Sequence, residues 1–189
     1  PSVVNDFTYM IQNPKQDVAH QIAKFNFDYY FNESAFVSFQ YAFQFNKRLE
    51  FDLRRGDYKD IPALDLDLKT NTLNIDYKKS GHDWNLKSGI SASSQNNFAN
   101  PATGIRPLIP NYDKIDFGAY GIANYNFSDT FSVDGGLRYD FSKIDATKYY
   151  QKSRWDERGY NETFPEFIVG DYGTQWLTKP NFTFHNLFF

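Results

Sequence analysis

Five arginines and four aromatic residues are the side chains of this sequence best suited to hold a ligand. The arginines are Arg54, Arg55, Arg106, Arg154 and Arg158, and the aromatic residues are Tyr112, Tyr149, Tyr150 and Trp155. An arginine guanidinium can make planar, bidentate contacts with carboxylate, phosphate or catecholate oxygens, and an aromatic ring offers a flat apolar face. All nine lie in stretches that we expect to be long loops, where a rigid scaffold tends to carry binding groups. The alternative is that these residues fold the loops onto one another.

No arrangement of residues typical of a catalytic or metal site is found in the sequence. The three histidines, His20, His82 and His185, are far apart, and cysteine is absent. Asp65 and Asp67 could face the same side of a strand, but the spacing of a calcium-binding EF-hand loop is missing. We therefore expect no enzyme, no cofactor and no bound metal. The net charge is −3 without any run of basic residues, which argues against nucleic acid as a partner.

The scaffold that would carry these loops is clearest in the stretch 35–46, which reads AFVSFQYAFQFN. Large apolar residues alternate with small or polar residues throughout this stretch. In a β-strand successive side chains point to opposite faces, so the stretch predicts a strand with one apolar and one polar side. It is also long, because soluble strands average about 5 or 6 residues while a membrane-crossing strand needs about 9 to 11.

The same alternation recurs along the chain and predicts an all-β, antiparallel, up-and-down sheet within a single domain. We expect strands at 18–31, 35–46, 66–77, 84–95, 114–127, 131–144 and 181–189. Tight turns at 32–34, 78–83 and 128–130 alternate with long loops at 47–65, 96–113 and 145–179. This asymmetry, with short turns at one end and long loops at the other, is typical of outer-membrane β-barrels.

The composition supports a membrane barrel. Aromatic residues make up 20% of the chain, yet the mean hydropathy is −0.64. No run of about 18 apolar residues exists, so we expect no membrane-spanning helix. Aromatic residues gather beside the short turns, where a girdle at the membrane interface would lie. They are Tyr29, Phe31, Phe36, Tyr77, Trp84, Tyr125, Phe127 and Phe131.

Three stretches of the sequence resemble the barrel portion of TonB-dependent outer-membrane receptors. They read FQYAFQFNKRLEFDLRRGDYKDIPALDLDLKTNTLNIDY, NNFANPATGIRPLIPNYDKIDFGAYGIANY and GLRYDFSKIDA. The resemblance implies a barrel of about 22 strands in the outer membrane of a Gram-negative bacterium, filled by an N-terminal plug. It also implies import of a scarce ligand, such as a ferric siderophore, powered by the inner-membrane protein TonB. Loops rich in arginine and aromatic rings would suit an anionic, ring-bearing siderophore.

The chain departs from that family pattern in two respects. It contains no plug and no energy-coupling box, and only about six or seven strands are recognisable. We therefore interpret it as an internal segment of the barrel, whose partners would be membrane lipid, the plug, the remaining strands, TonB and a small-molecule ligand. The alternative is a structural or adhesive β-domain without transport activity, either a small 8-stranded barrel or a soluble sandwich with the aromatic side as its core.

Overall fold

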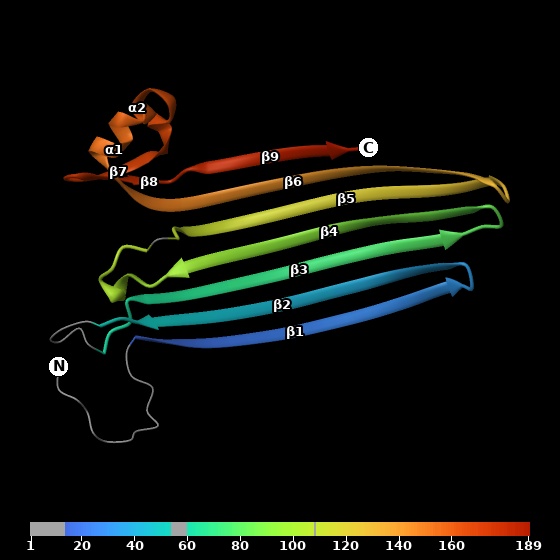
Figure 1. Cartoon of the computed structure of the whole chain (residues 1–189), viewed down its shortest axis with the longest axis horizontal. Helices are drawn as coiled ribbons and strands as arrows, with labels where there is room; N and C mark the ends of the chain where they lie inside the picture. Colours follow the sequence, from blue (N-terminus) through green and yellow to red (C-terminus); the bar gives the residue numbers. More distant parts are fainter. Residues whose placement is uncertain (1–13, 54–59, 108) are drawn as a thin grey trace, which may run out of the picture.

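A computed structural model describes residues 14–53, 60–107 and 109–189. These residues form one antiparallel sheet of nine strands (Figure 1). The strands are β1 (Lys15–Asn32), β2 (Ala35–Phe51), β3 (Leu64–Ser80), β4 (Trp84–Ala99), β5 (Asn111–Ser128), β6 (Phe131–Gln151), β7 (Ile168–Tyr172), β8 (Gln175–Thr178) and β9 (Asn181–Phe188). Two short helices, α1 (Lys152–Glu157) and α2 (Tyr160–Thr163), follow β6, and 3₁₀ turns lie at Pro101–Thr103 and Pro165–Phe167. No helix in the described ranges is long and apolar enough to cross a membrane.

Strands β1 to β6 pair in chain order, each antiparallel to the next. The outer edge of β6 is shared by two partners, since β9 pairs along Arg138–Asp145 and β8 pairs along Lys148–Gln151. Figure 1 shows the tight turns at one end of the sheet and the long connections, with both helices, at the other. The predicted all-β, up-and-down sheet with this asymmetry is therefore confirmed.

Most strands run further toward the long-connection end than the sequence predicted. β2 continues to Phe51 rather than ending at 46, β4 to Ala99 rather than 95, and β6 to Gln151 rather than 144. The expected loops 47–65 and 96–113 accordingly shrink to 52–63 and 100–110. The reason is that the prediction followed the apolar alternation, whereas backbone pairing continues past the apolar band into polar residues such as Lys47.

The expected loop 145–179 differs most from the prediction. Its first seven residues complete β6, and the rest holds α1, α2, a 3₁₀ turn and the β7–β8 hairpin. Gly173, at a φ of 68°, allows the tight turn of that hairpin, because glycine tolerates the left-handed region. The stretch is an ordered cap beside the end of β6.

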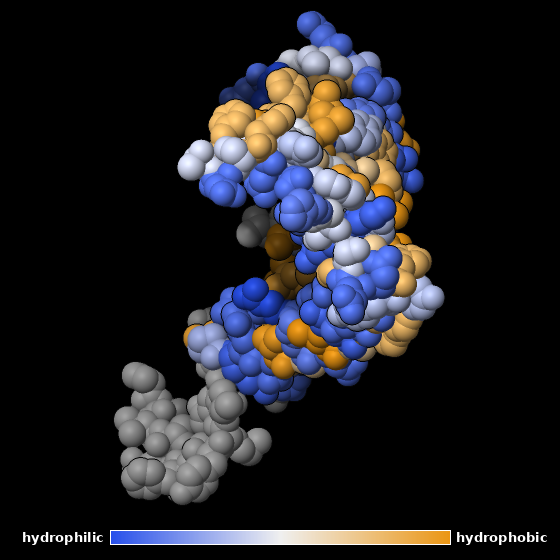
Figure 2. All heavy atoms as spheres, turned by 90° about the vertical axis from the view of Figure 1, so that its right-hand side faces the viewer, coloured by the Kyte–Doolittle hydropathy of each residue, from blue (hydrophilic) through white to orange (hydrophobic). Residues whose placement is uncertain are grey.

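The two sides of the sheet differ in chemistry, as the alternation predicts. In β2, Phe39 lies beside Phe27 and Ile75 on one side, while Gln40 lies beside polar partners on the other and donates from Nε2 to the amide oxygen of Asn26 at 3.1 Å. Figure 2 shows the sheet curved into an open arc with hydrophobic residues along its convex side. No second layer covers this side among the described residues, so they do not form the two-layer sandwich considered as an alternative.

The space around two glycines of β5 agrees with the direction in which the sheet curves. On the concave side, a Cβ built on Gly118 would lie 2.6 Å from a carboxylate oxygen of Asp140 and 2.7 Å from the hydroxyl of Ser91. On the convex side, a Cβ on Gly121 would meet nothing within 4 Å. Side chains therefore converge on the polar, concave side and spread apart on the apolar, convex side.

Aromatic rings cluster beside the tight turns on the convex side. Tyr29 and Phe31 have ring centroids 5.0 Å apart, and Tyr125 and Phe127 are 4.7 Å apart. The prediction was wrong for Phe36, which lies on the other side and stacks on Tyr30 at 5.2 Å. Its even position in β2 shares the side of Ser38 and Gln40, so the parity of the strand decides its direction.

Candidate ligand-binding site

Four cationic side chains surround a pocket at the long-connection end of β6, with a volume of about 460 Å³. Arg106 comes from the connection between β4 and β5, Lys148 from the end of β6, and Arg154 and Arg158 from α1 and the residue after it. Pro107, Tyr150 and Gln151 complete the lining. Three of the predicted arginines and one predicted tyrosine therefore meet in one place.

The local structure explains why two arginines converge. Helix α1 begins directly after β6, and Arg158 follows its last residue. Residues four apart lie on the same side of a helix, so Arg154 and Arg158 face the same way. Gly159 then takes a φ of 68° and turns the chain toward α2.

Within the described residues, no ion pair with a carboxylate balances the positive charge of the pocket. Ion pairs near it join other groups, such as Lys152 with Asp171 at 2.6 Å, and none includes Arg106, Lys148, Arg154 or Arg158. Two of these cations instead lie over rings. The Lys148 ammonium is 4.9 Å from the centroid of Tyr150, and the Arg158 guanidinium is 6.0 Å from that of Tyr160. Such a pocket is electropositive and can accept an anion.

Trp155 does not line the pocket but packs behind Tyr150, which does. Its side chain is 3% exposed and packs edge-on against Tyr150 at 5.3 Å and Tyr160 at 5.1 Å. Adjacent residues of a strand face opposite ways, so Tyr149 lies on the other side of β6 from Tyr150, where it contacts Tyr172 at 5.4 Å. Arg54 and Arg55 fall outside the described residues.

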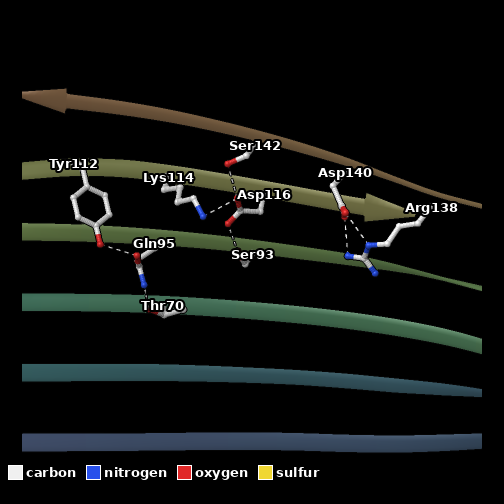
Figure 3. Close-up of polar contacts among 9 residues, drawn as sticks. All are labelled: Thr70, Ser93, Gln95, Tyr112, Lys114, Asp116, Arg138, Asp140 and Ser142. Carbon is white, nitrogen blue, oxygen red and sulfur yellow. Dashed lines mark hydrogen bonds and ion pairs between the residues drawn. The ribbon is translucent and has the colours of Figure 1, made fainter. Parts of the chain in front are cut away.

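Tyr112 was expected in a loop but lies in β5, on the concave side of the sheet (Figure 3). Its hydroxyl donates to the amide oxygen of Gln95 at 2.7 Å, and the Gln95 amide nitrogen donates to the Thr70 hydroxyl at 3.1 Å. This chain of contacts crosses from β5 to β3. Tyr112 therefore joins the wall of the sheet, away from the residues that line the basic pocket.

Asp116 is the centre of a second network on the concave side (Figure 3). Ser93 from β4 and Ser142 from β6 donate to its two carboxylate oxygens at 2.8 and 2.7 Å. The Lys114 ammonium lies 2.9 Å away from the same carboxylate. One side chain thus joins three neighbouring strands, and the wall satisfies its own polar groups.

Sequence reasoning missed Lys148 and Gln151 as parts of the pocket. Both follow the last apolar alternation of β6, and nothing in their local sequence separates them from ordinary loop residues. Among the described residues, no group of three or more histidines, aspartates or glutamates could hold a metal ion.

The comparisons with known proteins agree with the fold. The family described as "TonB dependent receptor-like, beta-barrel" matches residues 2–185, nearly the whole chain. No curated protein and no solved structure matched the sequence. Because the family match covers far more than half of the chain, this protein belongs to the TonB-dependent receptor β-barrel family, whose members are transport receptors of the outer membrane.

Proposed function

We propose that this chain forms part of the wall and outer loops of a receptor that imports a scarce anionic ligand, such as a ferric siderophore. The observation that supports the ligand class is the pocket of Arg106, Lys148, Arg154 and Arg158, none of which has a carboxylate partner among the described residues. Family membership supports the role in outer-membrane transport.

The chemistry of the pocket suits an anion with several oxygen atoms. Guanidinium groups present parallel N–H donors that match carboxylate or catecholate oxygens two at a time. Lys148 adds a compact charge that adapts to oxygens outside that plane. The ring of Tyr150 supplies an apolar surface beside these donors. A ferric complex with acidic, ring-bearing arms satisfies both requirements.

The proposal includes the partners that family membership implies in general. Lipid would contact the convex, aromatic side of the sheet, where Phe39, Tyr41 and Phe43 point. Further strands would continue the sheet from the edge of β1, which has no second partner among the described residues. A plug domain would face the polar concave side, and TonB would supply energy. The host would be a Gram-negative bacterium.

Binding of a ferric tricatecholate complex tests the ligand class. The chain in detergent micelles is titrated with the complex, and quenching of tryptophan fluorescence reports binding. We expect the double variant Arg154→Ala/Arg158→Ala to bind at least tenfold more weakly, because charge-assisted hydrogen bonds contribute about 1.5–3 kcal/mol each. The double variant Arg154→Lys/Arg158→Lys keeps the charge but loses the planar donors, so an intermediate affinity is expected.

The matched control removes two cations at the other end of the sheet. Lys78 and Lys79 lie at the end of β3 beside a tight turn, far along the strands from α1. The variant Lys78→Ala/Lys79→Ala should retain the affinity of the parent chain. Equal losses in the control and in the arginine variant would mean that overall charge attracts the complex, and the proposed pocket would then be wrong.

A further inference from the structure

A polar recess opens on the convex side of the sheet, at the end where the long connections lie. Its volume is about 390 Å³. Six side chains of its lining carry amide, carboxylate, hydroxyl or ammonium groups, and they are Asn96 from β4, Asn111 and Asp113 from β5, Asp145 and Thr147 from β6, and Lys179 between β8 and β9. None of them lines the basic pocket, so the recess is a separate feature of the sheet.

The register places the recess directly beyond the apolar residues of the convex side. Along β5, Phe117, Ile115 and Asp113 occupy successive convex positions, each about 7 Å further toward the long connections. In the neighbouring strand, Lys143 lies opposite Ile115. One step further along, Asp145 lies opposite Asp113. The convex side therefore changes from apolar side chains to the polar recess within about 14 Å of strand.

Two carboxylates lie next to each other in the recess. Asp113 and Asp145 are directly opposite in β5 and β6, an arrangement of like charges that is unfavourable in a sheet. Asn96 donates from Nδ2 to Oδ1 of Asp113 at 2.7 Å. The Lys143 ammonium lies 3.5 Å from Oδ2 of Asp145. These contacts use one oxygen of each carboxylate, so the recess keeps strong acceptors for a ligand.

Hydrogen-bond donors lie beside these acceptors. Asn111 accepts the backbone N–H of Ala99 through Oδ1 at 2.7 Å, which fixes the side chain and keeps its amide nitrogen as a donor. Thr147 adds a hydroxyl and Lys179 adds an ammonium group. Donors and acceptors mixed in so small a space suit the hydroxyl groups of a sugar, because each hydroxyl both donates and accepts.

Other classes of ligand fit the recess less well. Two adjacent carboxylates repel an anion such as phosphate. A calcium ion takes six to eight oxygen ligands, and the described residues hold no group of three or more acidic or histidine side chains that could bind a metal. Phe98 also lines the recess and is exposed, and its ring offers a flat apolar face to the C–H groups of a sugar.

We propose that the recess binds the neutral sugar headgroup of a glycolipid, in the membrane leaflet at the long-connection end. The neighbouring apolar residues favour a lipid over a soluble sugar. Acyl chains lying along Phe117 and Ile115 would bring the headgroup to Asp113 and Asp145, the next convex positions. The inference rests on the part of the proposed function that places lipid against the convex side, and it is independent of the imported ligand.

Two lipids with identical acyl chains test the inference. The chain is purified in micelles of a polyoxyethylene detergent, which contains no sugar. Native mass spectrometry then measures its affinity for dioleoylglycerol with a diglucosyl headgroup and for dioleoylphosphatidylcholine. We expect the parent chain to bind the diglucosyl lipid about tenfold more tightly, because hydrogen bonds to charged groups are strong. The free disaccharide lacks the acyl chains and should bind about a hundredfold more weakly than the diglucosyl lipid.

The variant Asp113→Asn/Asp145→Asn keeps the size of both side chains and removes the carboxylates. It should lose the preference for the diglucosyl lipid and bind phosphatidylcholine as the parent chain does. The matched control is Asp17→Asn/Asp67→Asn, which removes two charges from convex positions of β1 and β3 near the same end of the sheet. Neither residue lines the recess, so the control should keep the preference.

Three outcomes would overturn the inference and leave the proposed function intact. The first is equal affinity of the parent chain for the two lipids. The second is the same preference in the recess variant and in its control, whether kept or lost. The third is binding of the free disaccharide as tightly as the diglucosyl lipid, which would assign the recess to a soluble sugar. If neither lipid binds the parent chain, the placement of lipid on the convex side fails as well.

Discussion

Arg138 holds Asp140 through two parallel hydrogen bonds, from Nε to Oδ2 at 2.8 Å and from Nη2 to Oδ1 at 2.7 Å. The two residues are neighbours on the same side of β6, two positions apart. Four other ion pairs follow the same pattern, with the cation first: Lys15–Asp17, Arg48–Glu50, Lys114–Asp116 and Lys143–Asp145. Each of these strands therefore neutralises much of its own charge. Lys148, the one cation of the basic pocket that lies on a strand, is followed two positions later by Tyr150 instead of a carboxylate.

The close fit of Gly118 against this pair predicts an asymmetric response to alanine. A Cβ at Gly118 would lie 2.6 Å from Asp140 and 3.1 Å from the Arg138 guanidinium, whereas Gly121 has open space. Gly118→Ala should lower the free energy of unfolding by about 1–2 kcal/mol, because both partners must shift. Gly121→Ala should leave it unchanged or raise it slightly. Urea unfolding in lipid vesicles measures both, and equal effects would contradict the assignment of the two sides.

Asp116 should stabilise the contact between three strands. In Asp116→Asn one carboxylate oxygen becomes an N–H donor facing a serine hydroxyl, and the ion pair with Lys114 is lost. We expect a loss of about 1–2 kcal/mol in the free energy of unfolding. Asp129→Asn, in the exposed turn after β5, serves as the control and should change stability little. If Asp116→Asn leaves the free energy of unfolding unchanged, the network contributes nothing measurable to stability.

The medium that contacts the convex side can be tested with two adjacent positions of β2. Phe43 points to the convex side and Gln44 to the concave side. Phe43→Arg should cost about 2 kcal/mol of folding free energy in vesicles, within the range for arginine on the lipid face of a barrel. Gln44→Arg should cost much less, because its side chain points toward the polar side. A larger cost for Gln44→Arg than for Phe43→Arg would mean that lipid contacts the concave side of the sheet.

Trp155 should report the ordered cap after β6. The sequence has three tryptophans, so Trp84→Phe/Trp176→Phe leaves Trp155 as the sole tryptophan emitter. Its burial between Tyr150 and Tyr160 predicts emission blue-shifted from that of tryptophan in water and weak quenching by acrylamide. Emission and quenching equal to those of a free tryptophan would show that the cap does not pack as described.

The alternation of residues such as Phe43 and Gln44 was sufficient to predict seven of the nine described strands, their two sides and the end at which the long connections lie. It did not predict β7 and β8, which lie within the expected loop 145–179. This works because a strand exposes successive residues to opposite media, so each side carries the composition that its medium requires. The family resemblance was likewise contained in these stretches and their order.

Only the tertiary structure decided how far the strands extend and which loop residues meet. β6 continues to Gln151 because its backbone finds partners in β8 and β9, and such pairing leaves no trace in side-chain alternation once the apolar band ends. Arg106 and Lys148 are 42 positions apart, and they share a pocket because β5 and β6 return the chain to the same end of the sheet. Trp155 and Tyr149 read alike in sequence as loop aromatics. In the structure Trp155 is buried, whereas Tyr149 faces the opposite side of β6 from the pocket residue Tyr150. Contacts between distant segments, and not composition, determine where such side chains point.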